Sequence, residues 1–133
     1  METKIIHDLH IEPEQQGTYF TFSFPVPGDS ETLLIDYSYA RRPGEVTQEE
    51  KAVFTATPER NIIDLGLIAP DGSQVGASGS DKPRVLVSET TATPGYHPCL
   101  IVKGEWKVIV GAYKDAPEGV DVRFEITLTG KSL

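Results

Sequence analysis

The feature that most constrains the fold is a strict alternation of apolar and polar side chains in short segments. It is clearest at 120–129, where the apolar members are Val120, Val122, Phe124, Ile126 and Leu128. Because successive side chains of a strand point to opposite faces, this pattern predicts a strand with one buried and one solvated face. Such strands are typical of antiparallel sheets.

The same alternation predicts further strands at 4–11, 18–26, 32–39, 84–88 and 105–112. The segment 62–69 is apolar on both faces, which predicts a central strand. The Pro-Asp-Gly-Ser sequence at 70–73 predicts a tight turn after it, since Asp-Gly supplies the positive φ that such turns need. The Thr-Pro-Gly-Tyr sequence at 93–96 predicts a second fixed turn, one that presents Tyr96.

The spacing of these strands leaves room for very little helix. Thr47 and Glu50 have the spacing of a capping box, which predicts one short helix near 48–54. The 133 residues make up one domain, 1–133, and contain 12 Gly and 10 Pro, a turn-rich composition. We therefore expect an all-β, single-domain antiparallel β-sandwich, jelly-roll-like, with seven to nine strands.

Charge and cysteine content restrict the partners and the compartment. The formal net charge of −8 disfavours nucleic-acid binding and adhesion to an anionic membrane. The one cysteine, Cys99, cannot form an internal disulfide, and residues 1–8 lack the pattern of a secretory signal. We expect a cytoplasmic protein that has a protein partner or self-associates, with a homodimer as one form.

The three histidines and the cysteine are the side chains best suited to bind a metal ion or to act in nucleophilic catalysis. His7 and His10 are three apart on an expected strand, so they face opposite sides and cannot chelate one ion there. His97 and Cys99 are two apart and share a face of an extended segment, but nothing nearby supplies an orienting base. We predict no catalytic residue, no metal ligand and no cofactor; calcium bound by loop carboxylates is the alternative.

Two other features are interpreted as structural. The segment 76–83, which contains Ser78-Gly79-Ser80, is interpreted as a loop rather than as the site of a nucleophile. Trp106 is in phase with Val108 and Val110, which predicts that it packs in the core.

Aromatic and basic residues near turns are the candidates for ligand contacts. They are Tyr96, His97, Tyr113, Arg41 and Arg42. Aromatic rings can stack on a ligand, and the Arg41-Arg42 pair can grip a carboxylate or phosphate or balance nearby acids.

Motifs at 64–67, 70–72, 92–98 and 104–114 occur in the order that is found in one known family. They read Asp-Leu-Gly-Leu, Pro-Asp-Gly, Ala-Thr-Pro-Gly-Tyr-x-Pro and Gly-x-Trp-x-Val-x-x-Gly-x-Tyr-Lys. Over 20–129 the chain resembles the N-terminal β-sandwich accessory domain of bacterial PHP-type (CehA-like) metal-dependent phosphoesterases. The metal-binding histidines of the catalytic PHP domain have no counterpart here, so the resemblance implies an accessory domain without its catalytic half.

Three functional hypotheses follow. The first is a non-catalytic β-sandwich binding module that assists a PHP-type phosphoesterase or self-associates. The second is a carbohydrate-binding or other small-ligand-binding module, and the third is a small hydrolase that uses His97, Cys99 or the N-terminal histidines.

Overall fold

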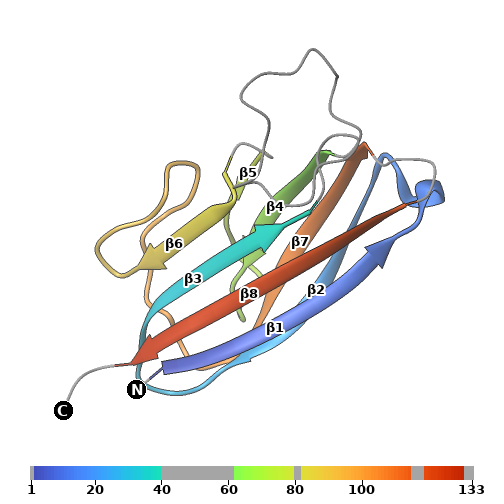
Figure 1. Ribbon diagram of the computed structural model, residues 1–133. Coiled ribbons are helices and arrows are strands. Elements are labelled where there is room, and N and C mark those ends of the chain that lie inside the picture. Colours follow the sequence, from blue (N-terminus) through green and yellow to red (C-terminus); the bar gives the residue numbers. More distant parts are fainter. Residues whose placement is uncertain (1, 40–61, 80–81, 115–118, 131–133) are drawn as a thin grey trace, which may run out of the picture.

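The computed structural model describes residues 2–39, 62–79, 82–114 and 119–130, and over these it is a two-layered β-sandwich (Figure 1). The strands are β1 (Glu2–Ile11), β2 (Thr18–Val26), β3 (Ser30–Ser38), β4 (Ile62–Ile68), β5 (Gln74–Ser78), β6 (Arg84–Ser88), β7 (Gly104–Lys114) and β8 (Val120–Gly130). A 3₁₀ turn, η1 (Pro13–Gln15), links β1 to β2. No helix in these residues is long and apolar enough to span a membrane.

Each sheet has four antiparallel strands. The first sheet has the order β1-β8-β3-β6, and the second has the order β2-β7-β4-β5. Of the connections between consecutive strands, only β4–β5 stays within a sheet, and the resulting order is that of an eight-stranded jelly roll. The predicted sandwich and its strand count are thus confirmed, and β4 is the predicted central strand.

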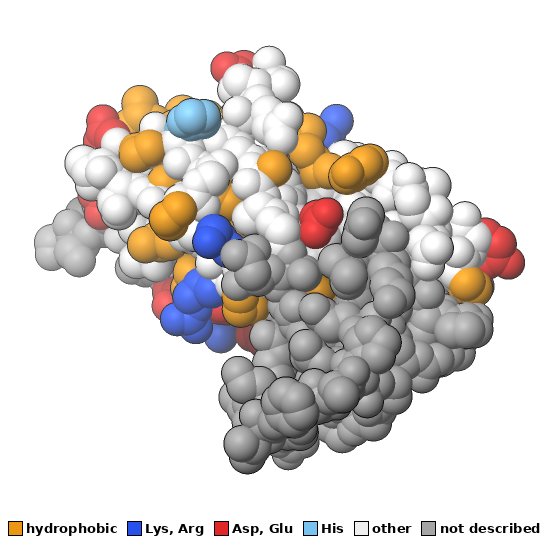
Figure 2. All heavy atoms as spheres, turned by 90° about the horizontal axis from the view of Figure 1, so that it is seen from above, with side chains coloured by type: hydrophobic (Ala, Val, Ile, Leu, Met, Phe, Trp, Pro, Cys, Tyr) orange, Lys and Arg blue, Asp and Glu red, His pale blue; other side chains and the backbone are white. Residues whose placement is uncertain are grey.

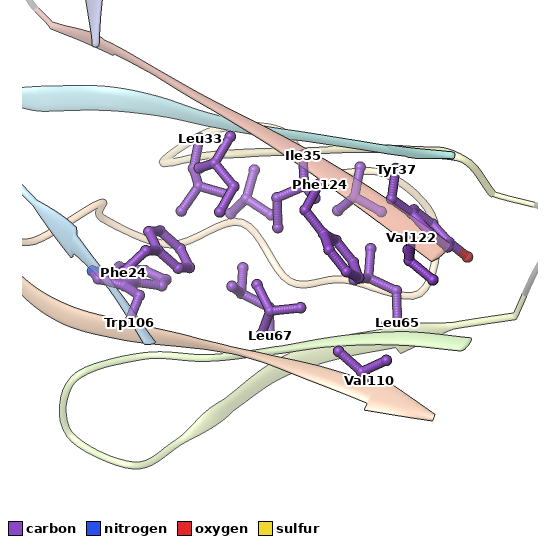
Figure 3. Close-up of a cluster of buried hydrophobic side chains, with 14 of the residues drawn as sticks. Phe24, Leu33, Ile35, Tyr37, Leu65, Leu67, Trp106, Val110, Val122 and Phe124 are labelled. Atoms are coloured by element: carbon purple, nitrogen blue, oxygen red, sulfur yellow. The ribbon is translucent and has the colours of Figure 1, made fainter. Parts of the chain in front are cut away.

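The core lies between the two sheets and is made by the apolar phase of each alternating segment. Figure 3 shows Phe24, Leu67 and Trp106 of the second sheet facing Leu33 and Phe124 of the first. The indole N–H of Trp106, which is fully buried, donates to the Val102 carbonyl over 2.9 Å. Burial of that ring therefore leaves no polar atom unpaired, and the predicted core role of Trp106 is confirmed.

The turn at 70–73 has the predicted geometry. Gly72 has φ +89°, and its N–H donates to the Ala69 carbonyl over 2.9 Å. The Asp71 carboxylate accepts from the amide and the hydroxyl of Ser73 over 2.9 and 2.6 Å. These two bonds lower the pKa of Asp71 and hold it in its turn.

One interpretation was wrong, and another concerns residues outside the described part. The segment 76–83 is not all loop, because its first three residues belong to β5 and pair with β4 through Leu65, Gly66 and Leu67. β5 pairs with β4, the strand that precedes it in the chain. The small residues at 76–79 carry no apolar alternation that would predict this strand. The helix expected near 48–54 lies outside the described residues.

Candidate functional site

Tyr96, the first predicted ligand residue, belongs to the interior. Its side chain is 6% exposed, and its hydroxyl donates to the Leu65 carbonyl over 3.2 Å and lies 2.9 Å from Ser78 Oγ. Burial raises the pKa of the Tyr96 phenol. The prediction that its turn presents Tyr96 to a ligand was wrong, although the turn itself is present, with the Tyr96 N–H donating to the Thr93 carbonyl over 2.9 Å.

A glycine explains why this tyrosine lies inside. Gly76 of β5 is bridged to Tyr96, and a Cβ on Gly76 would lie 2.6 Å from the Tyr96 ring and 2.4 Å from the Gly95 carbonyl oxygen. Only a glycine at position 76 therefore leaves room for the 93–96 turn to pack against β5 with the Tyr96 ring directed inward.

Of the other predicted ligand residues, the structure describes only the side chain of His97. His97 is exposed, and its backbone N–H donates to the Val75 carbonyl over 2.9 Å. Tyr113 lies in β7, at the opposite end of the second sheet from the 70–73 turn, and its side chain is outside the described part. Arg41 and Arg42 also lie outside the described residues.

His97 and Cys99 line one hollow beside the 70–73 turn, which we call the His97 hollow. Its volume is about 350 Å³, and its rim includes Asp71 and the exposed side chains of Leu100 and Val102. Burial, and then the negative charge of Asp71, raise the pKa of the Cys99 thiol. A raised pKa favours the neutral thiol over the thiolate, which is the form that nucleophilic cysteines use.

The N-terminal histidines lie on opposite faces of β1, as predicted. The ring of His7 faces inward and stacks on Phe22 of the second sheet, with centroids 3.9 Å apart and planes 6° apart. His10 faces outward, with Nδ1 2.7 Å from Asp121 Oδ1 and Nε2 2.9 Å from Glu12 Oε1. The hydrogen bond to Asp121 is the main cause of the raised pKa of His10.

The described part of the chain has no cluster of potential metal ligands. Residues 2–39, 62–79, 82–114 and 119–130 contain no group of three or more His, Cys, Asp or Glu side chains placed to hold one ion. The calcium alternative therefore has no assigned residues there.

The outer face of the second sheet carries a larger hollow, which we call the Tyr19 groove. Its volume is about 620 Å³, and its lining residues come from all four strands and the residue after β5: Tyr19, Asp64, Leu65, Gly66, Gln74, Ala77, Ser78, Gly79, Ile109 and Gly111. Tyr96 and His97 are not among these described lining residues.

The groove exists because glycines alternate with larger side chains across the strands. In one row, Gly111 of β7 lies opposite Tyr19 of β2 on one side and Asp64 of β4 on the other. In the next row, Gly66 lies between Ile109 and Ala77. Each glycine removes one side chain from its row, and a neighbouring side chain, Ile109 over Gly66 and Tyr19 over Gly111, occupies part of that space, so both glycines are buried.

Tyr19 forms the wall of this groove. Its side chain is 73% exposed, the most exposed large hydrophobic side chain in the described residues. A Cβ on Gly111 would lie 2.8 Å from Tyr19 Cε1, so the ring leans over the glycine and leaves its other face open. The sequence did carry a signal for this site, namely glycine at the outward positions of two predicted strands.

The outer face of the first sheet is very different. The Arg123 guanidinium donates to both oxygens of Asp8 over 2.8 and 3.0 Å, and Arg84 donates to Asp36 over 2.7 Å. Lys4 lies 3.8 Å from Glu125. This face is covered by cross-strand ion pairs, and none of its strands contributes to either hollow.

Apolar side chains on the surface are dispersed. Seen from one end of the sandwich, hydrophobic side chains lie in several separate groups with acidic and basic side chains between them (Figure 2). The exposed large hydrophobic residues of the described part are Ile6, Tyr19, Leu100 and Val102. They belong to three regions: β1, the Tyr19 groove and the His97 hollow.

Comparison with solved structures gives matches that include two of low sequence identity. No protein-family model matches the chain, and no curated protein matches it. The periplasmic g-type lysozyme inhibitor PliG of Aeromonas hydrophila aligns with 98% of this chain and 86% of its own, at 9% identity and a TM-score of 0.42. A chain from the complex of the Aeromonas sobria serine protease with its chaperone ORF2 aligns with 100% of this chain and 28% of its own, at 10% identity and a TM-score of 0.42.

Proposed function

We propose that this protein is a non-catalytic binding module that takes a segment of a partner protein into the Tyr19 groove. The observation that carries the proposal is the groove itself: an aromatic ring, 73% exposed, beside a hollow of about 620 Å³ on the outer face of the second sheet. An exposed aromatic ring supplies a large contact area to a bound segment.

The partner that we propose is a PHP-type phosphoesterase that lacks a sandwich domain of its own. This rests on the resemblance of 20–129 to the accessory domain of such enzymes, whose catalytic histidines have no counterpart in this chain. The proposed setting is the cytoplasm, and fractionation of cells that carry a tagged copy tests that part.

Co-purification tests the function. The tagged chain is co-expressed with such a phosphoesterase from the same genome, and the recovered enzyme is quantified. Tyr19→Ala should lower recovery at least tenfold, whereas Leu100→Ala, which removes an exposed side chain from the His97 hollow, should not. Failure of the wild type to recover the enzyme, or equal recovery with Tyr19→Ala, would contradict the proposal.

A carbohydrate ligand is the second candidate, favoured by one observation. The open face of the Tyr19 ring, 73% exposed beside a hollow of about 620 Å³, is a surface on which a sugar ring can stack. Tyr96 was predicted from the sequence to contact a ligand, but its side chain is buried, whereas that of Tyr19 is exposed. On a glycan array, Tyr19→Phe should keep the signal and Tyr19→Ala should lose it; an array without signal for the wild type rejects this candidate.

A further inference from the structure

The two sides of the sandwich end in different kinds of edge strand. On one side, β5 and β6 have five residues each, and the segment 89–103 lies along them. That segment forms bridges to both strands, Gly76 with Tyr96 and Val87 with Ala92, and the Cys99 N–H donates to the Ser88 carbonyl over 2.9 Å. These edges are therefore short and covered, as soluble sheets require.

On the other side, no described segment pairs with the free edges of the two outer strands. β1 has ten residues and pairs only with β8, and β2 has nine and pairs only with β7, within the described residues. In Figure 1, β1 forms the outer margin of its sheet. A long edge strand with free backbone N–H and C=O groups is a template for pairing with another strand.

The sequence of β1 is complementary to itself when it is read antiparallel. With Ile6 placed opposite Ile6 of a second copy, Lys4 lies opposite Asp8 of that copy, and Glu2 lies opposite His10. Each of these pairs occurs twice because the arrangement is two-fold symmetric. Opposite charges facing each other across an antiparallel pair are stabilising, and like charges are destabilising.

The register also suits the backbone and the surrounding charges. Both members of every pair are odd-numbered or both are even-numbered, so the backbone groups at the free edge of one copy meet those of the other. On the side of β1 that faces β8, Asp8 already accepts from Arg123. Pairing with Lys4 of a second copy on the opposite side of β1 would therefore continue a row of alternating charges across the strands. His10 would likewise lie between Glu2 of the second copy and Asp121.

Apolar side chains add to this complementarity on both faces of β1. On the outer face, Ile6 is 52% exposed, and in this register it packs against its own copy at the two-fold axis. On the inner face, Ile5, His7 and Leu9 are only half-buried, although they belong to the core side of the strand. A second strand beside β1 would cover them further.

We propose that β1 pairs antiparallel with β1 of a second copy of this chain, with Ile6 on the two-fold axis, to form a dimer with a continuous eight-stranded sheet. The occupant is a second copy rather than another protein because the charges of β1 match those of β1 itself. The dimer uses the first sheet and leaves the Tyr19 groove free, so it is independent of the proposed function.

The first experiment places two lysines, one from each copy, opposite each other at the two-fold axis. The dimer dissociation constant is measured by sedimentation equilibrium for the wild type, Ile6→Lys and Thr21→Lys. Thr21 is exposed on β2, the other long edge strand, and is the matched control. Ile6→Lys should raise the constant at least tenfold and Thr21→Lys should leave it unchanged; a monomeric wild type at millimolar concentration would overturn the proposal.

The second experiment tests the register by charge exchange. Lys4→Glu alone places two carboxylates opposite each other, and Asp8→Lys alone places two ammonium groups opposite each other, so each should weaken its own dimer at least tenfold. In an equimolar mixture the two variants complement each other, and a mixed dimer should form. Failure of the mixture to dimerise, with both variants retaining the wild-type circular dichroism, would rule out this register.

Discussion

The inner faces of the two sheets are alike, and their outer faces are not. Both sheets bury an alternating set of large apolar side chains in one core, with Phe124 from the first and Trp106 from the second fully buried. On the outside, the first sheet carries ion pairs such as Asp8–Arg123, whereas the second carries the glycines and Tyr19 that form a groove. The need for a core restricts only one face of each sheet, so the other face is free to carry function.

The largest effects should come from the inner faces, and they should be equal. Trp106→Ala and Phe124→Ala each remove a fully buried ring, so each should lower the free energy of unfolding by about 3–5 kcal/mol. Urea denaturation measures both variants. A loss below about 1 kcal/mol for either would mean that the two inner faces do not share one core.

Substitution of two glycines of the second sheet, one on its inner face and one in the groove, should have different effects on stability. A Cβ on Gly76 would meet backbone 2.4 Å away, so Gly76→Ala should cost about 3 kcal/mol in unfolding free energy. A Cβ on Gly66 would lie 3.0 and 3.1 Å from Cδ1 and Cβ of Ile109, which are longer contacts than those at Gly76, so Gly66→Ala should cost less, about 1–2 kcal/mol. If the two variants lose the same unfolding free energy in the urea titration, the surroundings of Gly66 are as rigid as those of Gly76.

A hydroxyl on each side of the same sheet gives the third contrast. Tyr96→Phe removes a buried hydroxyl that bonds to the Leu65 carbonyl and Ser78, so it should cost about 1–2 kcal/mol. Tyr19→Phe removes an exposed hydroxyl and should leave stability unchanged. Thermal unfolding of the two variants makes the comparison, and an unaffected Tyr96→Phe would show that the inner hydroxyl is dispensable.

The smallest effect should be the pH dependence of the outer face of the first sheet. Asp121 raises the pKa of His10, so the folded state binds the His10 proton more tightly than the unfolded chain does. The resulting stabilisation is complete below the unfolded pKa of about 6.5 and disappears as pH rises through the folded pKa. The melting temperature of the wild type should therefore exceed that of His10→Gln by more at about pH 6 than at about pH 8.5.

The opposite pH trend would show that the His10–Asp121 contact does not favour the protonated imidazole. If the two melting temperatures are the same at both pH values, this pair contributes as little to stability as most exposed ion pairs do.

The sequence alone determined seven of the eight strands, all but β5, and which face of each points to the core. Alternation in segments such as 120–129 is a local property, because each residue's face follows from its parity within one strand. The same local rule separated His7 from His10 and placed Trp106 in the core.

Only the tertiary structure decided where the sites lie. Tyr96 follows a turn and was expected outside, but pairing of its segment with β5 at Gly76 directs the ring inward. The Tyr19 groove joins residues from β2, β4, β5 and β7, whose adjacency depends on strand order. Strand order is set by contacts between distant segments packing into one core, and alternation within a single strand carries no record of its neighbours.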